Sequence, residues 1–376
     1  MFQHDGGRSW NKGKSGKSVS ETICPFFCQQ IVKFSFSSTT KIKIHMIKMS
    51  TSPEDFIKGT AKAYDRVSKI ALKTPLLKSL WLSNLTGCNV YMKMESEQIT
   101  RSFKIRGAVN KMSSVIESGA DNVVTASSGN HGLACAYAGS KLGVCVTIYC
   151  PLTASPAKLT AIQSYSNATV TKHGDECAET ESYARSQANN KNIPYMSPYN
   201  DVDNIFGQAT IAYEILEDLP DVNAVFIPVG GGGLASGISG YLKATNKDIV
   251  TIGCQPEGNA AMYHCIQADR ILEDNSFLKD TLADGVAGGV EPGAVTFDLC
   301  KQNIDKWSLV GEDEIEKAVF DMIDKEKKLV EGAACLAIAA LLRMKAEFQG
   351  KNVVLIMCGG NINTSVVASV CSKFLS

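Results

Sequence analysis

Apolar residues recur at strand and helix spacings from Ser52 to the end of the chain. Short valine- and isoleucine-rich runs that are bounded by glycine, proline or polar residues predict strands, and the amphipathic segments between them predict helices. The predicted strands cover 89–94, 122–126, 144–150, 169–174, 224–229, 249–255 and 353–357. The predicted helices cover 53–67, 133–142, 156–164, 177–188, 207–219 and a segment from Leu234. This alternation predicts an α/β fold in which parallel twisted sheets carry helices on both faces.

Local signals place the ends of several elements. Ser52 followed by Pro53 is typical of an N-cap and the first position of a helix. Asp313 and Glu316 have the spacing of a capping box, and the apolar residues after them share one helix face. The strand at 353–357 ends directly before Cys358, and ligands of open α/β sheets bind at such strand ends.

The first 50 residues have a different composition from the rest. They contain eight Lys and Arg residues against two acids, are rich in serine and glycine, and show no sustained period. This composition predicts a disordered basic leader. Organelle targeting stays open as an alternative, although Arg8 is the only arginine of the segment. Because Met49 begins a segment that could itself start a protein, we expect the leader to lie outside the working part of the chain.

Composition excludes several classes of function. The chain has 376 residues, of which 44% are hydrophobic, and its 38 Lys and Arg balance 38 Asp and Glu, so no charge excess favours nucleic acid or an anionic membrane. The apolar stretch 329–344 is too short to span a bilayer. The 13 cysteines include no CxxC pair, and Cys135, Cys145, Cys150 and Cys335 lie in apolar runs. We therefore expect buried free thiols and a cytoplasmic location.

One lysine stands in an unusual place for an ammonium group. Lys104 in SFKIRGA precedes apolar side chains at helical spacing, which puts it in the first turn of a helix. A cation there opposes the helix dipole, and desolvation lowers its pKa, so part of it is a free amine that can form a Schiff base. A solvated lysine at a helix start is the alternative.

Two loops between a strand and a helix are suited to bind anions. Gly230, Gly231, Gly232 and Gly233 offer unhindered backbone N–H groups at a helix start, which predicts a phosphate site. SSGNHG at 127–132 adds two hydroxyls and an amide, which suits a carboxylate. A nicotinamide oxidoreductase is the alternative for the glycine loop, but the spacing differs from GxGxxG and leaves Lys104 unexplained.

SFKIRGA, SSGNHG, GGGGLASG and CGGN occur in this order. Together they resemble the pyridoxal-phosphate enzymes of the tryptophan-synthase-β type, called fold type II, and within it the serine/threonine dehydratases and serine racemases. The resemblance covers about Thr74 to the C-terminus. It implies a homodimer in which 51–117 and 199–376 form a large cofactor-binding domain and 118–198 a small inserted domain.

The resemblance also assigns residues to pyridoxal 5′-phosphate and to an amino-acid substrate. The cofactor would be held by Phe103, Lys104, Asn130, Gly230, Gly231, Gly232, Gly233, Leu234 and Cys358. The substrate would be bound by Ser127, Ser128, Gly129, Asn130 and His131, and a packed imidazole is the alternative for His131. Gln255 stands where the family's cation site has a carboxylate, so we expect a weak cation site or none, with Gln255 and Asn259 as its weak candidate ligands.

The implied reaction is β-elimination from L-serine or L-threonine, which yields a 2-keto acid and ammonia. Lys104 would be the general base, and Cys358 would face the pyridine nitrogen as a weak donor. Ser128 could return a proton from the opposite face, which leaves serine racemase open. Tyr199 favours elimination because dehydratases tend to be aromatic at this position. An O-acetylserine sulfhydrylase and a cofactor-binding protein without activity are the remaining alternatives.

Overall fold

The computed structural model describes residues 51–375, so the leader predicted at 1–50 lies outside the described residues. The strands are β1 (Leu76–Lys78), β2 (Asn89–Lys93), β3 (Asn122–Ala126), β4 (Cys145–Cys150), β5 (Ala168–Lys172), β6 (Ala224–Pro228), β7 (Val250–Pro256), β8 (Lys306–Val310) and β9 (Asn352–Ile356). The α-helices are α1 (Pro53–Val67), α2 (Leu80–Thr86), α3 (Lys104–Glu117), α4 (Asn130–Leu142), α5 (Pro156–Gln163), α6 (Cys177–Lys191), α7 (Val202–Asp218), α8 (Gly233–Thr245), α9 (Ala261–Gln267), α10 (Val295–Asn303), α11 (Glu312–Asp324), α12 (Gly332–Met344) and α13 (Thr364–Leu375). Short 3₁₀ turns complete the fold, among them η1 (Glu95–Glu97) and η3 (Asp284–Val286).

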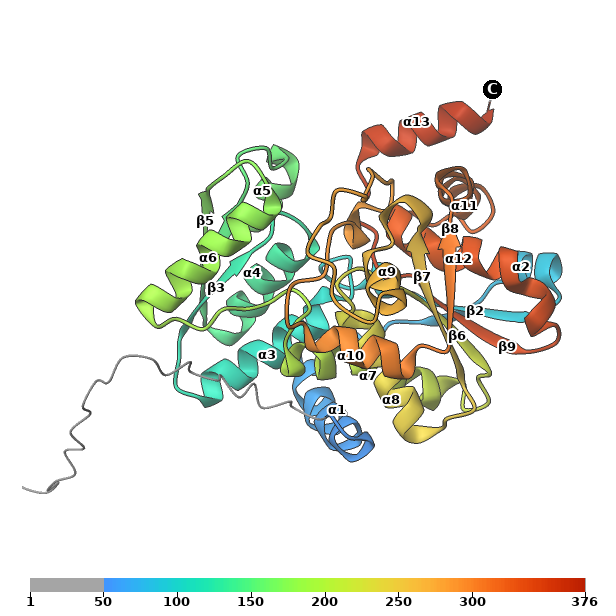
Figure 1. Ribbon diagram of the computed structural model, residues 1–376, viewed down its shortest axis with the longest axis horizontal. Coiled ribbons are helices and arrows are strands. Elements are labelled where there is room, and N and C mark those ends of the chain that lie inside the picture. Colours follow the sequence, from blue (N-terminus) through green and yellow to red (C-terminus); the bar gives the residue numbers. More distant parts are fainter. Residues whose placement is uncertain (1–50, 376) are drawn as a thin grey trace, which may run out of the picture. The chain divides into compact units, whose positions relative to one another are not determined.

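The strands form two separate sheets (Figure 1). The larger has the order β1-β2-β9-β6-β7-β8, and the smaller has the order β3-β4-β5. All neighbouring strands are parallel except β1 and β2, which pair antiparallel. The predicted α/β class with parallel sheets is therefore confirmed. The antiparallel edge strand β1 was not predicted, because it has only three residues and directly follows Pro75.

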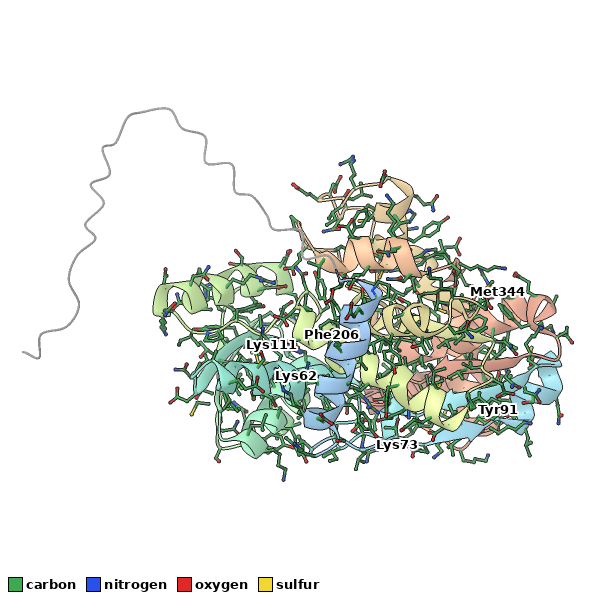
Figure 2. The ribbon with its side chains drawn as sticks, turned by 90° about the horizontal axis from the view of Figure 1, so that it is seen from below. Lys62, Lys73, Tyr91, Lys111, Phe206 and Met344 are labelled. Atoms are coloured by element: carbon green, nitrogen blue, oxygen red, sulfur yellow. The ribbon has the colours of Figure 1, made fainter. Side chains whose placement is uncertain are left out.

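Helices cover the sheets as their apolar residues require. α12 is buried along most of its length and packs on β6, β7, β8 and β9, which explains the long apolar stretch in its sequence. α8 packs on β6 and on α7, and α7 in turn packs on α1 and α3 (Figure 1). Phe206 of α7, labelled in Figure 2, meets the ring of Phe56 on α1 edge-on, with ring centroids 5.6 Å apart. The described residues include no helix long and apolar enough to cross a membrane.

Three local predictions were wrong. The capping residues of α11 are Gly311 and Glu314, whose carboxylate accepts the Gly311 N–H at 2.9 Å, whereas Asp313 and Glu316 both pair with Lys373. α7 begins at Val202 rather than 207, because the Asp201 side chain caps it by accepting the N–H groups of residues 203 and 204. Cys145 is exposed at the start of β4, although Cys135, Cys150 and Cys335 are buried as predicted.

Four charged side chains are buried together between α3, α7 and the end of β2. Arg106 binds both oxygens of Glu95, at 2.8 Å each, and both oxygens of Glu214, at 2.6 and 2.8 Å. Lys93 binds Glu214 at 2.6 Å, and all four side chains are 2% exposed or less. Burial by itself would raise the pKa of Glu95, but the Arg106 charge more than offsets it and the pKa falls. This buried charge cluster (Lys93, Glu95, Arg106 and Glu214) fixes the start of α3.

We expect Glu214→Gln to lower the free energy of unfolding by about 3–5 kcal/mol, since it leaves Lys93 and Arg106 with unbalanced buried charge. Urea unfolding followed by circular dichroism measures the change. Glu54→Gln is the matched control, because the Glu54–Lys58 pair is more than 70% exposed and should contribute less than about 0.5 kcal/mol. Equal effects of the two variants would contradict a structural role for the cluster.

Candidate active site

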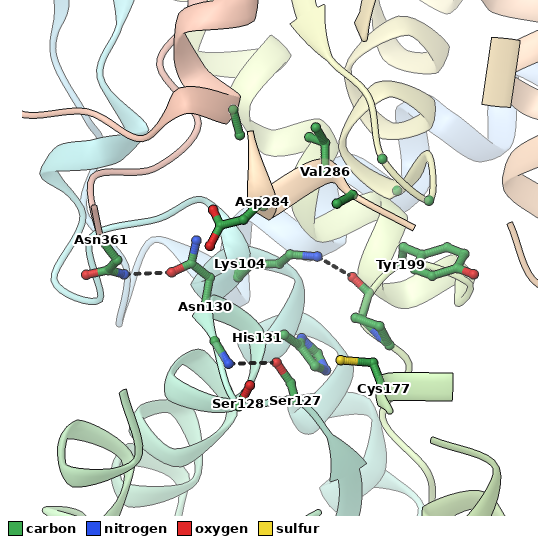
Figure 3. Close-up of a pocket in the computed structure, with 18 of the residues that line it drawn as sticks. Lys104, Ser127, Ser128, Asn130, His131, Cys177, Tyr199, Asp284, Val286 and Asn361 are labelled. Carbon is green, nitrogen blue, oxygen red and sulfur yellow. Dashed lines mark hydrogen bonds between the residues drawn. The ribbon is translucent and has the colours of Figure 1, made fainter. Parts of the chain in front are cut away.

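The four sequence motifs converge on one cavity of about 640 Å³ (Figure 3). SSGNHG connects β3 to α4, the glycine loop connects β6 to α8, and Cys358 follows β9, so each motif lies at the C-terminal end of a strand. Lys104 is the first residue of α3. The predicted residues that line the cavity are Phe103, Lys104, Ser127, Ser128, Gly129, Asn130, His131, Gly230, Gly231, Gly232, Gly233, Leu234 and Cys358. The volume is typical of small-molecule sites.

The Lys104 amine is buried inside this cavity. Its Nζ donates a hydrogen bond to the Pro198 carbonyl at 2.8 Å and lies 5.1 Å from the centre of the Phe103 ring. Burial lowers the pKa of Lys104 to about 8, although the thiols of Cys135 and Cys358 and the Glu331 carboxyl act in the opposite direction. About a tenth of the amine is therefore uncharged at pH 7, and nucleophilic chemistry requires this free form.

The glycine loop has the geometry of an anion site. Gly232 has a φ of 90°, which is in the left-handed region that favours glycine, and α8 begins at the next residue without a side-chain cap. The N–H groups of the first turn are therefore available to a ligand. Tyr199 lies directly behind the loop, since a Cβ on Gly231 would be 2.5 Å from its ring. A residue with a side chain at position 231 would therefore collide with the Tyr199 ring.

The SSGNHG loop turns into α4 beside Lys104. Ser127 Oγ accepts the Gly129 N–H at 3.2 Å, and α4 begins at Asn130 without a side-chain cap (Figure 3). His131 is 2% exposed, and its Nε2 lies 3.1 Å from the Met196 carbonyl and 3.5 Å from the Cys135 sulfur. Burial, together with the Lys104 charge, lowers the pKa of His131 to about 3. The imidazole is thus neutral and held by the protein, which favours the packed alternative.

Cys358 lies at the end of β9 next to the lysine segment. Its carbonyl accepts the Phe103 N–H at 3.1 Å, and Ser102 forms a bridge with Gly359, so the two motifs are joined through their backbones. Burial raises the pKa of the Cys358 thiol well above its usual value, with a further contribution from the Glu331 carboxyl. The group at this position is therefore a neutral thiol.

Lys158, Cys177 and Glu181 also line the cavity but carried no recognisable signal in the sequence. Lys158 and Asp284 form an ion pair of 3.1 Å at the cavity wall, and Cys177 and Glu181 come from α6. The positions of Lys158, Cys177 and Glu181 depend on chain segments that are remote in sequence, so no local pattern could have identified these three residues. Glu331 is buried and binds Asn130 and the backbone of Asn361.

Both amides of the weak cation site are engaged with the backbone. Gln255 Nε2 donates to the Val229 carbonyl at 3.1 Å, and its Oε1 accepts the Tyr263 N–H at 2.9 Å. Asn259 accepts the Gly288 N–H at 3.0 Å and donates to the Lys279 carbonyl at 2.8 Å. Residues 51–375 contain no group of three or more His, Cys, Asp or Glu side chains that could hold a metal. These two amides therefore connect backbone segments.

Comparisons with known proteins agree with this geometry. A family model described as pyridoxal-phosphate dependent enzyme matches residues 67–359. The chain is 39% identical over 303 residues to the catabolic L-threonine dehydratase of Staphylococcus aureus, covering 79% of this chain and 86% of that protein. The structure of threonine deaminase isoform 2 from Solanum lycopersicum matches with a TM-score of 0.79 and 32% identity, covering 85% and 94% of the two chains. The structure of serine racemase from Dictyostelium discoideum matches with a TM-score of 0.75 and 34% identity, covering 82% of this chain and 98% of that chain.

The fold, with its two largely parallel sheets, is that of fold type II pyridoxal-phosphate enzymes. The chain belongs to the pyridoxal-phosphate-dependent enzyme family, as its motifs predicted. The residues present fit the cofactor, because a buried amine, an aromatic ring and a bare glycine cradle line the same cavity. The amine can react with the aldehyde of the cofactor, and the glycine cradle can bind its phosphate.

We expect acetylation of Lys104 in the cofactor-free protein to rise with pH to half its maximal rate near pH 8, since burial favours loss of the proton. In urea the same lysine should behave as an ordinary one, with its midpoint at about pH 10.4. Mass spectrometry of the peptide that contains Lys104 measures both profiles. Coinciding profiles would show that folding does not shift the amine.

Proposed function

We propose that the protein is an ammonia-lyase that converts L-serine or L-threonine to a 2-keto acid and ammonia. The main support for this proposal is the buried Lys104 amine, which lies in one cavity with two loops suited to a phosphate and a carboxylate. Similarity to a protein named L-threonine dehydratase, at 39% identity, supports the substrate class.

Each loop has a separate task in this proposal. The N–H groups of Gly230 to Gly233 and of Leu234 hold the phosphate, and Phe103 packs against the ring. Ser127, Ser128, Gly129 and Asn130 surround the substrate carboxylate, and His131 supports this loop through its contact with the Met196 carbonyl. Orientation by these loops places the substrate's α-hydrogen towards Lys104.

The electrostatics of the site favour elimination. When bound, pyridoxal phosphate withdraws electrons from the α-carbon of the substrate. Lys104 is partly uncharged near neutral pH, so its Nζ can take the α-proton as general base. Cys358 stays a neutral thiol and gives little charge to the ring nitrogen. The β-hydroxyl group would then leave as water, with a proton that the bound phosphate would supply.

Serine racemase is the second candidate, and the position of Ser128 favours it. Ser128 lines the same cavity as Lys104, so its hydroxyl could deliver a proton to the α-carbon from another direction. The structural similarity to a serine racemase, at 34% identity, also agrees with this activity. Dehydratases tend to carry an aromatic residue at the position of Tyr199, which supports elimination as the main reaction.

We further propose the organisation of the working enzyme. Residues 51–117 and 199–376 would form the cofactor-binding domain, with 118–198 as a small domain built on β3, β4 and β5. A homodimer in the cytoplasm is the proposed state. The free cysteines of the described residues are consistent with a reducing compartment.

The purified protein should release keto acid from L-serine or L-threonine, and Lys104→Ala should lower kcat by about a thousandfold or more, because it removes both the cofactor attachment and the base. Keto acid is measured with lactate dehydrogenase, and threo-3-hydroxyaspartate completes the substrate panel. Full turnover by the variant would refute the proposal, as would a colourless protein after reconstitution with pyridoxal phosphate.

Ser128→Ala separates the two activities. If Ser128 donates the second proton, the variant should lose D-serine formation by about a hundredfold or more while keto-acid release falls much less. Chiral chromatography measures D-serine. Absence of D-serine from the wild-type reaction would leave elimination as the sole activity.

A further inference from the structure

Glu331 is a buried carboxylate in the active-site cavity to which the proposed reaction gives no role. It precedes α12 and is 4% exposed. Its Oε1 accepts hydrogen bonds from Asn130 Nδ2 at 2.9 Å and from the Asn361 backbone N–H at 2.8 Å, and its Oε2 accepts from Asn130 Nδ2 at 3.1 Å. All three contacts are made by N–H groups.

The surrounding backbone makes room for this carboxylate. A Cβ on Gly359 would lie 2.6 Å from Glu331 Oε2, and one on Gly285 would lie 3.2 Å from it. The Glu331 N–H also donates to the Gly359 carbonyl at 3.0 Å. The carboxylate is therefore held from several sides, and its position is well defined.

The hydrogen bonds continue from Glu331 through two asparagines. Asn130 Oδ1 accepts from Asn361 Nδ2 at 2.7 Å (Figure 3), and the same Nδ2 donates to the Thr100 carbonyl at 3.0 Å. This amide relay (Glu331, Asn130, Asn361 and the Thr100 carbonyl) joins the SSGNHG loop, the loop after β9 and the segment before Lys104.

The two ends of the relay fix the direction of every amide in it. An ionised carboxylate and a backbone carbonyl can only accept hydrogen bonds. Asn361 must therefore turn its NH₂ group towards Thr100, and Asn130 must turn its own towards Glu331. Since Asn130 Oδ1 is engaged with Asn361, the group left for an oxygen in the cavity is the second hydrogen on Asn130 Nδ2.

We propose that Glu331 is a positioning residue that orients the Asn130 amide so that it offers an N–H, rather than a carbonyl, to a bound cofactor oxygen. This inference rests on the proposed role of Asn130 in cofactor binding. Glu331 acts through Asn130 and does not itself touch the reacting atoms. A buried carboxylate whose partners are N–H groups is suited to this task, because it cannot donate in its ionised form.

Glu331→Gln tests the proposal with almost no change in shape. The new NH₂ group would face either Asn130 Nδ2 or the Asn361 N–H, so one donor would oppose another. We expect the Asn130 side-chain amide to exchange its hydrogens about tenfold faster than in the wild type, and pyridoxal phosphate to bind about tenfold more weakly. NMR of protein labelled with ¹⁵N-asparagine measures the first, with the signal assigned through Asn130→Asp, and fluorescence titration measures the second.

Two further variants complete the experiment. Asn361→Asp leaves Glu331 intact but places an acceptor against Asn130 Oδ1. It should therefore produce the same two changes, faster amide exchange and weaker cofactor binding. This variant also tests the proposal if Glu331→Gln does not fold. Glu326→Gln is the matched control, because its carboxylate accepts only the Ser79 hydroxyl, at 2.5 Å, among the contacts of the described residues, and a hydroxyl can rotate. It should change neither quantity by more than about twofold.

The outcomes separate this inference from the proposed function. If the wild type binds pyridoxal phosphate and releases keto acid, but Glu331→Gln and Asn361→Asp keep wild-type amide exchange and cofactor affinity, the positioning role is refuted alone. If the wild type fails to bind the cofactor, the proposed function falls, and unchanged amide exchange in the variants would then overturn the relay as well. Faster exchange in both variants, with the control unchanged, supports it.

Discussion

The active site depends on a guanidinium that has no access to solvent. Arg106 lies two residues after Lys104 on α3 and binds Glu95 and Glu214 with both of their oxygens. A fully buried charge is tolerated only when it is paired and hydrogen-bonded, so the position of α3 is tightly constrained. Because Lys104 begins this helix, the same constraint determines where the reactive amine lies.

The cavity itself follows from the direction of the strands. Parallel strands bring their C-terminal ends to one edge, and the loops after β3, β6 and β9 all contribute to the cavity at such ends. The helices that follow β3 and β6 begin without side-chain caps, so their first N–H groups are available to ligands. The fold thus leaves the first N–H groups of α4 and α8 open to a ligand, and α3 brings the Lys104 amine to the same cavity.

Burial then gives the titrating groups their separate properties. It lowers the pKa of Lys104 to about 8 and that of His131 to about 3, and it raises that of the Cys358 thiol. The sequence indicated that Lys104 and Cys358 were of interest because they lie in recognisable motifs. For His131 it left two interpretations, and only the Met196 carbonyl, 65 positions away, shows how the imidazole is held.

The sequence by itself determined the α/β class, most strands and helices, and the motifs that line the cavity, because these depend on local periodicity and on turns between neighbouring residues. It misplaced the cap of α11, where Glu314 rather than Glu316 closes the first turn, since several acids there have similar spacings. The tertiary structure decided which polar groups meet. Glu214 lies 108 positions from Arg106, and Glu331 lies 201 from Asn130. Pairs so distant are set by packing of the whole chain, and no local pattern records them.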